Sequence, residues 1–516
     1  MRIEPAFQLA GICGLVILGS CSVAQDAPPP AADPIAPRVR APIVAREGAR
    51  KYPPGRDYML ERIQMIREKE GSQRGNYEFD SNWNTFRNSV ARFAGAWQYA
   101  WQGSPLAKAF NDKIEASNPE EAADILLSVA KYPMNYDAQL DCEGQRIIDQ
   151  LLRSGLPALF DSLSDPQPMV PESNIERPGI MHPMPALGDA RSLVRFNLAR
   201  MSLARRRGDD LEFARALRHN LAINHAVSRD ASLIAHLVYV LLDSNTSQRI
   251  VEEQLAKAMS PELLRAAMAL IDESKTADWE LSINGERLMV LDAIDWAYQT
   301  GRFEVIGISE PTRAEDETID AFVARVGWAT REETLDEFDR ALTLYTWCFD
   351  DNADLAGKAA TQTEEWLAHF KKDAAYRKRF TVMSAAAPAI ARAMNMEQAA
   401  RWTRGAIKAF LAAELFRIEK GHAPESLGEL VPGYLPVLPI DWCSPTREPL
   451  RYKKLDAKAD SLGRAFLIYS VGRDGTDDSG KMDPERPRRA VDGGPEQVWK
   501  GYDLVFNWSE QLPDRK

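Results

Sequence analysis

Large apolar residues recur every three or four positions through most of this chain, from about residue 58 to residue 395. This spacing places them on one face of a helix and is not the period of two that a strand requires. The face either packs internally or forms a groove for a partner, whose candidate contacts are Trp83, Trp97 and Trp101. The clearest stripe consists of six large side chains: Trp83, Phe86, Val90, Phe93, Trp97 and Trp101.

Short capping motifs in the sequence also predict where helices begin. Asn118-Pro119-Glu120 and Ser260-Pro261-Glu262 each combine a capping side chain, a proline in the first turn and an acidic residue near the positive end of the helix dipole. Three helical segments are expected between residues 191 and 242, with a break at Gly208. Residues 191–226 weakly resemble a tetratricopeptide hairpin, but no regular 34-residue repeat follows. The prediction is a body of irregular α-hairpins.

The N-terminus predicts export. Residues 7–19 (FQLAGICGLVILG) are mostly apolar and have the length of a signal-peptide core, too short to span a bilayer. Leu18-Gly19-Ser20-Cys21 resembles the bacterial lipobox, which implies lipidation of Cys21. Ser22-Val23-Ala24 also fits a cleavage site that would release a soluble protein, and a retained anchor is a third alternative.

The predicted organisation has four parts. Residues 1–21 form a signal peptide of the lipoprotein type, and residues 22–57 form a tether rich in Pro and Ala that cannot bury enough surface to fold. The helical body covers residues 58–395, and an α+β domain covers residues 396–516. The overall fold class is therefore mainly α, with one small antiparallel sheet.

The net charge argues against one class of partner, and the spacing of the cysteines argues against a zinc site. A net charge of −11 without a long basic run argues against nucleic acid as a partner. If Cys13 is removed with the signal peptide and Cys21 is lipidated, three cysteines remain, and their separations match no zinc motif: Cys142, Cys348 and Cys443. Cys142 and Cys348 either form a disulfide or remain buried thiols.

The helical body carries no recognisable catalytic motif. His219, His225 and His236 are too irregularly spaced to place two imidazoles on one metal, and the sequence lacks H-E-x-x-H, G-x-S-x-G and G-x-G-x-x-G motifs. We interpret each histidine as a partly buried polar residue. A hydrolase that uses a pair of carboxylates cannot be recognised from one sequence, so it is kept as the alternative function.

The last part of the chain changes from helical to strand periodicity. A helix passes through Trp402 and Phe410 and ends at Gly421, with Pro424 preventing its return. Strands are predicted at residues 449–452, 465–469 and 502–508. In the last of these, apolar residues alternate with Asp503 and Asn507, which predicts that the apolar side faces the core: Tyr502, Leu504, Phe506 and Trp508.

About the last 120 residues resemble the C-terminal head of type II secretion major pseudopilins, in a variant carried by exported bacterial proteins. The resemblance rests on three strings: AAELFRIEKGHAPESLGELVPGYLPVLPIDWCSPTREPLRY, LIYSVGRDGTDDSG and YDLVF. Two departures stand out. The prepilin leader with its assembly helix is missing, which argues against polymerisation, and Trp442–Thr446 replaces the usual Pro-x-x-Gly turn after Asp441.

The resemblance implies that the acidic loop after the second strand can bind calcium. Its candidate ligands are Asp474, Asp477 and Asp478, whose carboxylates are the hard oxygen donors that calcium prefers. The alternative is a solvated acidic turn. Gly475–Lys481 also spells G-x-x-x-x-G-K, but Met482 replaces the required hydroxyl and the aspartates would repel phosphate, so we expect no nucleotide.

We therefore expect an exported, lipid-anchored protein of the bacterial cell envelope that acts as a non-catalytic scaffold or binding module. Its partners would be an envelope protein and, through the lipid, the membrane, with calcium as a cofactor of the C-terminal domain. The alternatives are a hydrolase of envelope polymers and a purely structural envelope component.

Overall fold

The computed structural model describes Glu61, Met65 and residues 185–508, with gaps at 229–231, 275, 309–310, 350–352, 445–446, 473 and 484–500. The described residues belong to two compact units. One unit, here called the sheet unit, contains residues 184–286 and 391–516, and the other, the all-helical unit, contains residues 287–390. Helices α13 and α18 each contribute residues to both units.

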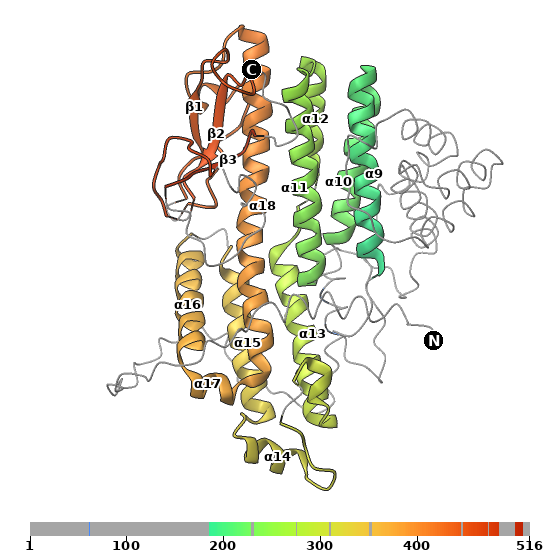
Figure 1. Ribbon diagram of the computed structural model, residues 1–516, viewed down its shortest axis with the longest axis vertical. Helices are drawn as coiled ribbons and strands as arrows, with labels where there is room; N and C mark the ends of the chain where they lie inside the picture. The colour runs from blue at the N-terminus through green and yellow to red at the C-terminus, as the bar shows by residue number, and fades with distance from the viewer. Residues whose placement is uncertain are drawn as a thin grey trace, which may run out of the picture. The chain divides into compact units, whose positions relative to one another are not determined.

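The sheet unit is built from antiparallel helices with a small sheet beside them. Within it α9 and α10 form a hairpin, and the α18 segment separates the sheet from α11 and α12 (Figure 1). Gly208 (φ 72°) makes the turn between α9 and α10, where glycine tolerates the left-handed conformation. The helices are α9 (Pro185–Arg207), α10 (Asp210–Ser228), α11 (Leu233–Ala256), α12 (Pro261–Glu273), part of α13 (Trp279–Thr300) and part of α18 (Thr381–Lys420).

One hydrophobic core joins these helices to the sheet. It includes Phe213 and Leu217 of α10 together with Phe410 of α18 and Phe466 and Phe506 of the sheet region. The ring of Phe410 lies 6.1 Å from that of Phe466 and 6.4 Å from that of Phe506. The predicted boundary at residue 396 falls inside α18, which runs without a break through that position.

The sheet has three antiparallel strands in the order β1-β2-β3. They are β1 (Arg451–Lys454), β2 (Phe466–Ser470) and β3 (Leu504–Val505), and the short 3-10 helix η4 (Leu427–Leu430) precedes them. In the register, Tyr452 pairs with Ile468. The predicted fold class, mainly helical with a small antiparallel sheet, is confirmed.

The predicted alternation in residues 502–508 is wrong. Asp503 and Asn507 are buried, whereas Tyr502 and Trp508 are only partly so. The Asn507 side chain accepts the N–H of Ile468 at 2.9 Å and donates to the carbonyl of Phe466 at 2.7 Å. Its amide thus replaces a peptide group in the ladder with β2, which is why a polar side chain faces inward.

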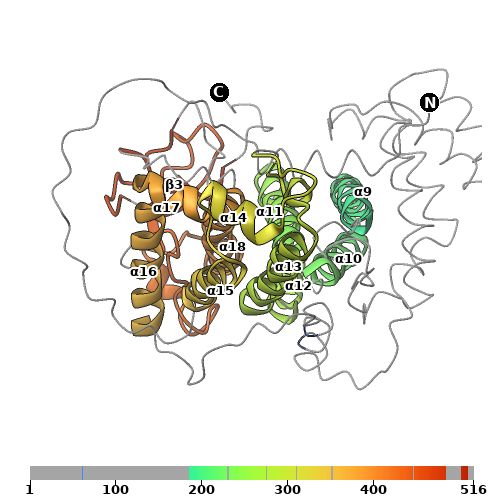
Figure 2. The ribbon, with the colours of Figure 1, turned by 90° about the horizontal axis from the view of Figure 1, so that it is seen from below.

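The all-helical unit is held by an aromatic cluster and by buried ion pairs. The rings of Phe303, Phe322 and Trp328 lie 5.2–5.7 Å from one another. Arg331 contacts Asp295 at 2.5 Å within the unit. Helices α15 and α16 lie side by side (Figure 2). The elements are the rest of α13, η3 (Phe303–Ile306), α14 (Ile319–Val326), α15 (Arg331–Trp347), α16 (Ala353–Lys372), α17 (Ala374–Arg379) and the start of α18.

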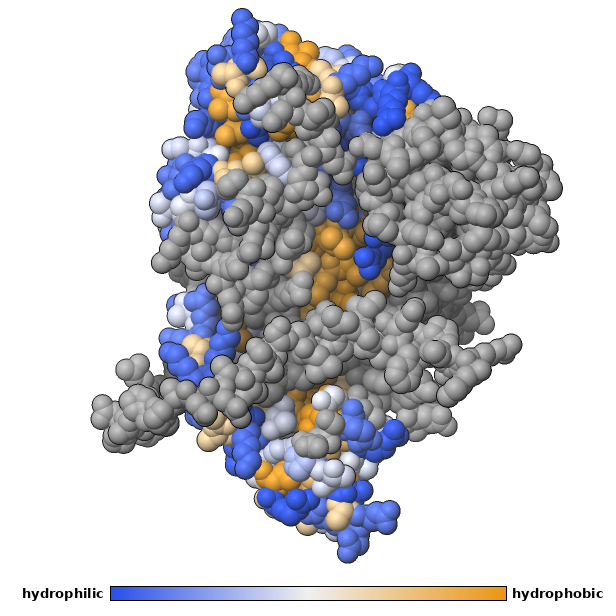
Figure 3. Space-filling view, in the orientation of Figure 1, coloured by the Kyte–Doolittle hydropathy of each residue, from blue (hydrophilic) through white to orange (hydrophobic). Residues whose placement is uncertain are grey.

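The last of the three helices predicted between residues 191 and 242, α11, does not bury the stripe of large apolar residues that its sequence contains. Its apolar stripe is only half-buried, whereas Ala235, His236 and Tyr239 face the interior. An apolar area in the middle of Figure 3 lies over α11. Within the described residues, no helix combines the length and the apolar character needed to cross a membrane. The half-buried stripe consists of Ile234, Leu237, Val238 and Leu241.

Candidate functional site

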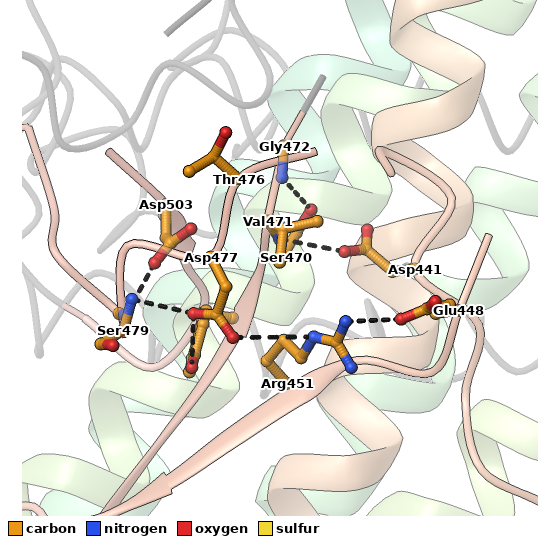
Figure 4. Close-up of polar contacts among 12 residues, drawn as sticks. Asp441, Glu448, Arg451, Ser470, Val471, Gly472, Thr476, Asp477, Ser479 and Asp503 are labelled. Atoms are coloured by element: carbon orange, nitrogen blue, oxygen red, sulfur yellow. Dashed lines mark hydrogen bonds and ion pairs between the residues drawn. The ribbon is translucent and has the colours of Figure 1, made fainter. Parts of the chain in front are cut away.

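The acidic loop, defined here as residues 472–483, follows β2. Its own carboxylates accept backbone N–H groups and so hold the loop in tight turns. Asp474 Oδ1 accepts the N–H of Thr476 at 3.1 Å. Asp477 Oδ1 accepts the N–H of Ser479 at 2.8 Å and the hydroxyl of Tyr469 at 3.1 Å (Figure 4). Aspartates that bond a backbone amide two residues further on stabilise tight turns. Two of the three predicted ligands are thus also turn residues.

A fourth carboxylate, which the sequence did not single out as a ligand, reaches the same loop. Asp503 precedes β3, is 2% exposed, and accepts the N–H of Gly480 on Oδ2 at 2.6 Å. Within the described part of the chain, Asp503 Oδ1 and Asp478 Oδ2 are buried without a hydrogen-bond partner. Burial raises the pKa of Asp503, and the charges of Asp477 and Asp478 add to this, although backbone amides oppose it.

The free carboxylate oxygens of Asp503 and Asp478 are of the type that a hard cation such as calcium prefers. One unpartnered carboxylate oxygen belongs to Asp478 of the acidic loop and the other to Asp503, which contacts the loop. A cation would satisfy both oxygens and would offset the negative charge of the loop. However, no group of three or more acidic, histidine or cysteine side chains among the described residues is arranged to hold a metal ion. Any further ligands would therefore come from backbone carbonyls or water.

Arg451 of β1 also approaches the loop. Its Nε lies 3.8 Å from Asp477 Oδ2, and its Nη2 lies 2.5 Å from Glu448 Oε2 (Figure 4). The contact to Asp477 is long and partly exposed, so it offsets the charge of the loop only weakly.

Asp441 clamps the beginning of the sheet region. Its carboxylate is 1% exposed and accepts the backbone N–H groups of Cys443 (3.1 Å), Ser444 (3.2 Å) and Val471 (3.1 Å). Burial raises the pKa of Asp441, while the hydrogen bonds from Ser470 and the backbone act against this. Figure 4 shows Asp441 directed at the end of β2. One side chain thus ties the turn at residues 442–444 to the strand that leads into the acidic loop.

A second polar cluster lies inside the helices of the sheet unit. His236 Nε2 lies 2.8 Å from Glu397 Oε2, and His236 Nδ1 lies 3.2 Å from Ser282 Oγ. This is the residue set of a serine hydrolase, but His236 and Ser282 are 0% exposed and Glu397 is 3% exposed. The Ser282 hydroxyl also donates to the carbonyl of Asp278 at 2.9 Å. A nucleophilic serine has to be accessible and to donate to the histidine, so this arrangement gives no support to hydrolysis.

The same cluster extends toward the turn that departs from the pseudopilin pattern. Glu397 Oε1 accepts from Arg401 Nε at 2.6 Å, and the Arg401 guanidinium stacks on Trp442 at 4.8 Å. Arg447 stacks on the same indole, also at 4.8 Å. Burial raises the pKa of Glu397, but the positive charges of His236 and Arg401 outweigh it and hold that pKa below its ordinary value.

The remaining sequence-predicted residues are less informative. Cys21, Trp83, Trp97, Trp101 and Cys142 lie outside the described residues, as do the predicted signal peptide and the whole of the predicted tether. Cys348 is buried, and its thiol donates to the carbonyl of Leu344 at 3.4 Å. Its pairing with Cys142 stays a prediction.

Sequence reasoning missed Glu397 and Asp503. The partners of Glu397 are 161 residues away in His236 and four residues away in Arg401, and only the latter spacing is visible in the sequence. Asp503 was assigned to the exposed face of a strand by the alternation rule, which failed there. Comparison of the chain with protein-family models, curated proteins and solved structures finds no match.

Proposed function

We propose that this protein is an exported, lipid-anchored, non-catalytic scaffold or binding protein of the bacterial cell envelope. The observation that carries the non-catalytic part is that, among the described residues, the Ser-His-Glu cluster and the buried carboxylate of Asp441 hold elements of the sheet unit together. Ser282, His236 and Glu397 join three helices inside the core, and Asp441 is saturated by backbone amides. The envelope assignment rests on residues 1–57 of the sequence, and an envelope protein is the expected partner.

The C-terminal part is proposed to be a pseudopilin-head-like module fused to this body. A helix laid beside a three-stranded antiparallel sheet supports the proposal, as does the turn clamped by Asp441.

Calcium is the cofactor that the acidic loop fits best. Asp503 and Asp478 would hold it through their unpartnered oxygens, with backbone carbonyls or water as further ligands, and Asp474 and Asp477 would add negative charge to the same loop. The ion would neutralise the carboxylates that raise the pKa of Asp503. A ligand that binds only the folded state stabilises it by RT ln(1 + [L]/Kd), about 2.7 kcal/mol at a hundredfold excess over Kd.

Thermal melts of the mature chain, from Gln25 onward, test the calcium proposal. We expect millimolar calcium to raise Tm relative to chelator, and we expect Asp503→Asn and Asp477→Ala each to abolish the rise. Asp456→Asn is the matched control, because Asp456 also bonds an amide two residues on, that of Lys458 at 3.0 Å, in an exposed turn away from the loop. An equal Tm with and without calcium would leave the aspartates as turn residues only.

Cys21→Ser tests the anchor. We expect the wild-type protein to incorporate labelled fatty acid and to sediment with membranes, and the variant to lose the label. An unlabelled wild-type protein that is released in soluble form would show cleavage at Ser22-Val23-Ala24 instead. Photocrosslinking from position 97 in cells, compared with position 211, an exposed position on α10, tests whether the tryptophan stripe contacts an envelope protein.

A further inference from the structure

A positive patch lies in the all-helical unit, where α16 ends and α17 begins. Five of the twelve basic residues between positions 287 and 390 fall within nine positions, together with a single acidic residue, Asp373. The rest of that stretch has seven basic and eighteen acidic residues, so its positive charge is concentrated in one place. The basic patch, as it is called below, consists of Lys371, Lys372, Arg377, Lys378 and Arg379.

The patch is formed by two short basic runs, which α17 brings together by folding back on the end of α16 (Figure 1). Arg377 Nη1 donates to the carbonyl of Phe370 at 3.1 Å and to the carbonyl of Lys371. The ring of Tyr376 lies 5.9 Å from that of Phe370 and 4.7 Å from that of His369. A cation is favourable beside the last carbonyls of a helix, so this contact fixes the corner.

Only part of the charge of the patch is neutralised by neighbouring groups. Arg379 pairs with Glu333 of α15 at 2.6 Å, with both side chains about half exposed. The carboxylate of Asp373 is occupied as the N-cap of α17. Lys372 and Lys378 are exposed and form no ion pair within the described part of the chain. Because like charges at this spacing repel one another, an anionic partner would relieve the repulsion.

The patch fits a broad anionic surface better than a small anion. Four of its five side chains are exposed, and Arg377 is partly buried. Among the described residues, no buried polar atom that lacks a partner belongs to the patch, so it does not have the enclosed donors of a small-anion site. Lysine also presents a mobile point charge and not the planar fork that grips a single phosphate. Such charges suit a surface that carries many headgroups.

Two kinds of extended anionic partner are a phospholipid surface and a nucleic acid. The N-terminal sequence favours the phospholipid surface, because an exported chain leaves the compartment that holds nucleic acid. Lipid on Cys21 would also keep the patch near a membrane, since a flexible tether as long as residues 22–57 spans roughly 30 Å. This choice of partner rests on the proposed export and lipid anchor.

We propose that the basic patch binds the anionic headgroups of a phospholipid bilayer and thereby orients the all-helical unit on the membrane to which the chain is anchored. Each lysine or arginine close to such a surface raises the partition coefficient by about fivefold. The attraction falls off within a Debye length, about 8 Å at physiological ionic strength, so it acts only when the patch faces the headgroups.

Co-sedimentation of the mature chain from Gln25, which lacks Cys21 and therefore the lipid, tests the patch by itself. We expect the chain to bind vesicles of phosphatidylcholine mixed with phosphatidylglycerol, not to bind vesicles of phosphatidylcholine alone, and to dissociate at high salt. Lys372→Glu and Lys378→Glu should each weaken binding by at least about fivefold. Lys358→Glu is the matched control, because Lys358 is an exposed residue nearer the start of α16 and the change in charge is the same.

Equal binding by the wild-type protein and by the Lys372 and Lys378 variants would overturn the proposal, as would no binding to the anionic vesicles. Binding to duplex DNA but not to the vesicles would also overturn it and would assign the patch to a nucleic acid. The result is separable from the anchor: loss of vesicle binding with Cys21 still labelled would remove only the patch, and vesicle binding with Cys21 unlabelled would remove only the anchor.

Discussion

At the residue scale, single side-chain carboxylates and amides bond the backbone groups that another strand would bond in a longer sheet. Asp441 accepts two backbone amides of its own turn, those of Cys443 and Ser444, and also the amide of Val471 after β2. Asn507 completes the pairing of β2 after β3 has ended. Because a buried amide without a partner costs roughly 1–3 kcal/mol, each of these side chains decides where the backbone can be buried.

Two glycines of the acidic loop have the same backbone conformation but different surroundings, so a substitution at one is a control for the same substitution at the other. Gly472 (φ 68°) and Gly480 (φ 76°) have the same left-handed backbone, which costs a residue with a Cβ about 1–2 kcal/mol. A Cβ on Gly472 would meet nothing within 4 Å, whereas one on Gly480 would lie 2.9 Å from Leu467 Cδ1.

We therefore expect Gly480→Ala to destabilise the protein more than Gly472→Ala, by about 1 kcal/mol or more from overpacking. Urea unfolding of both variants measures the difference. Equal losses would mean that Leu467 moves aside at no cost.

At the scale of elements, the local sequence predicted where helices begin and end, but it did not predict which helices contact one another. Ser260 caps α12 by accepting the N–H of Leu263 at 3.1 Å, as predicted, and α18 ends before Gly421 (φ 79°), also as predicted. One of the contacts that hold α18 to α11 is a buried ion pair between Arg404 and Asp243, with bonds of 2.9 and 3.0 Å.

Removing one partner of this pair should be costly, because it leaves the other charge buried. We expect Arg404→Met to lower the free energy of unfolding by about 3–5 kcal/mol, and the double variant with Asp243→Leu to recover a large part of it. A double-mutant cycle by urea unfolding measures the coupling.

Lys408→Met is the control on the same helix. Lys408 pairs with Asp272 of α12, but the two side chains are 36% and 56% exposed, so we expect a loss of under about 1 kcal/mol. Similar losses of free energy of unfolding for the two single variants would show that burial does not increase the contribution of the Arg404 pair to stability.

At the scale of the whole molecule, the sheet unit has a core assembled from distant parts of the chain. Leu217 and Val251 share it with Phe410, Phe466 and Phe506. Residues 396–516 therefore share their core with helices that precede them by more than a hundred residues.

This shared core predicts that residues 391–516 do not fold alone. Without α10–α12, the α18 segment would expose an apolar face that includes Ile407, Phe410 and Leu411, all at most 1% exposed in the unit. We expect the fragment to bind a hydrophobic dye and to melt without a cooperative transition, while the mature chain melts cooperatively. A cooperative melt of the fragment would establish it as an independent domain.

The sequence by itself determined the helical class, the three strand positions, the cap at Ser260 and the acidic loop, because periodicity, capping and turn chemistry act over a few neighbouring residues. It assigned the wrong face to residues 502–508, because alternation assumes that polar side chains point to solvent, and Asp503 and Asn507 have partners inside. The tertiary structure alone brought His236 to Glu397 and Asp503 to the loop. Those contacts depend on which helices and strands pack together, and no local pattern in the chain encodes that choice.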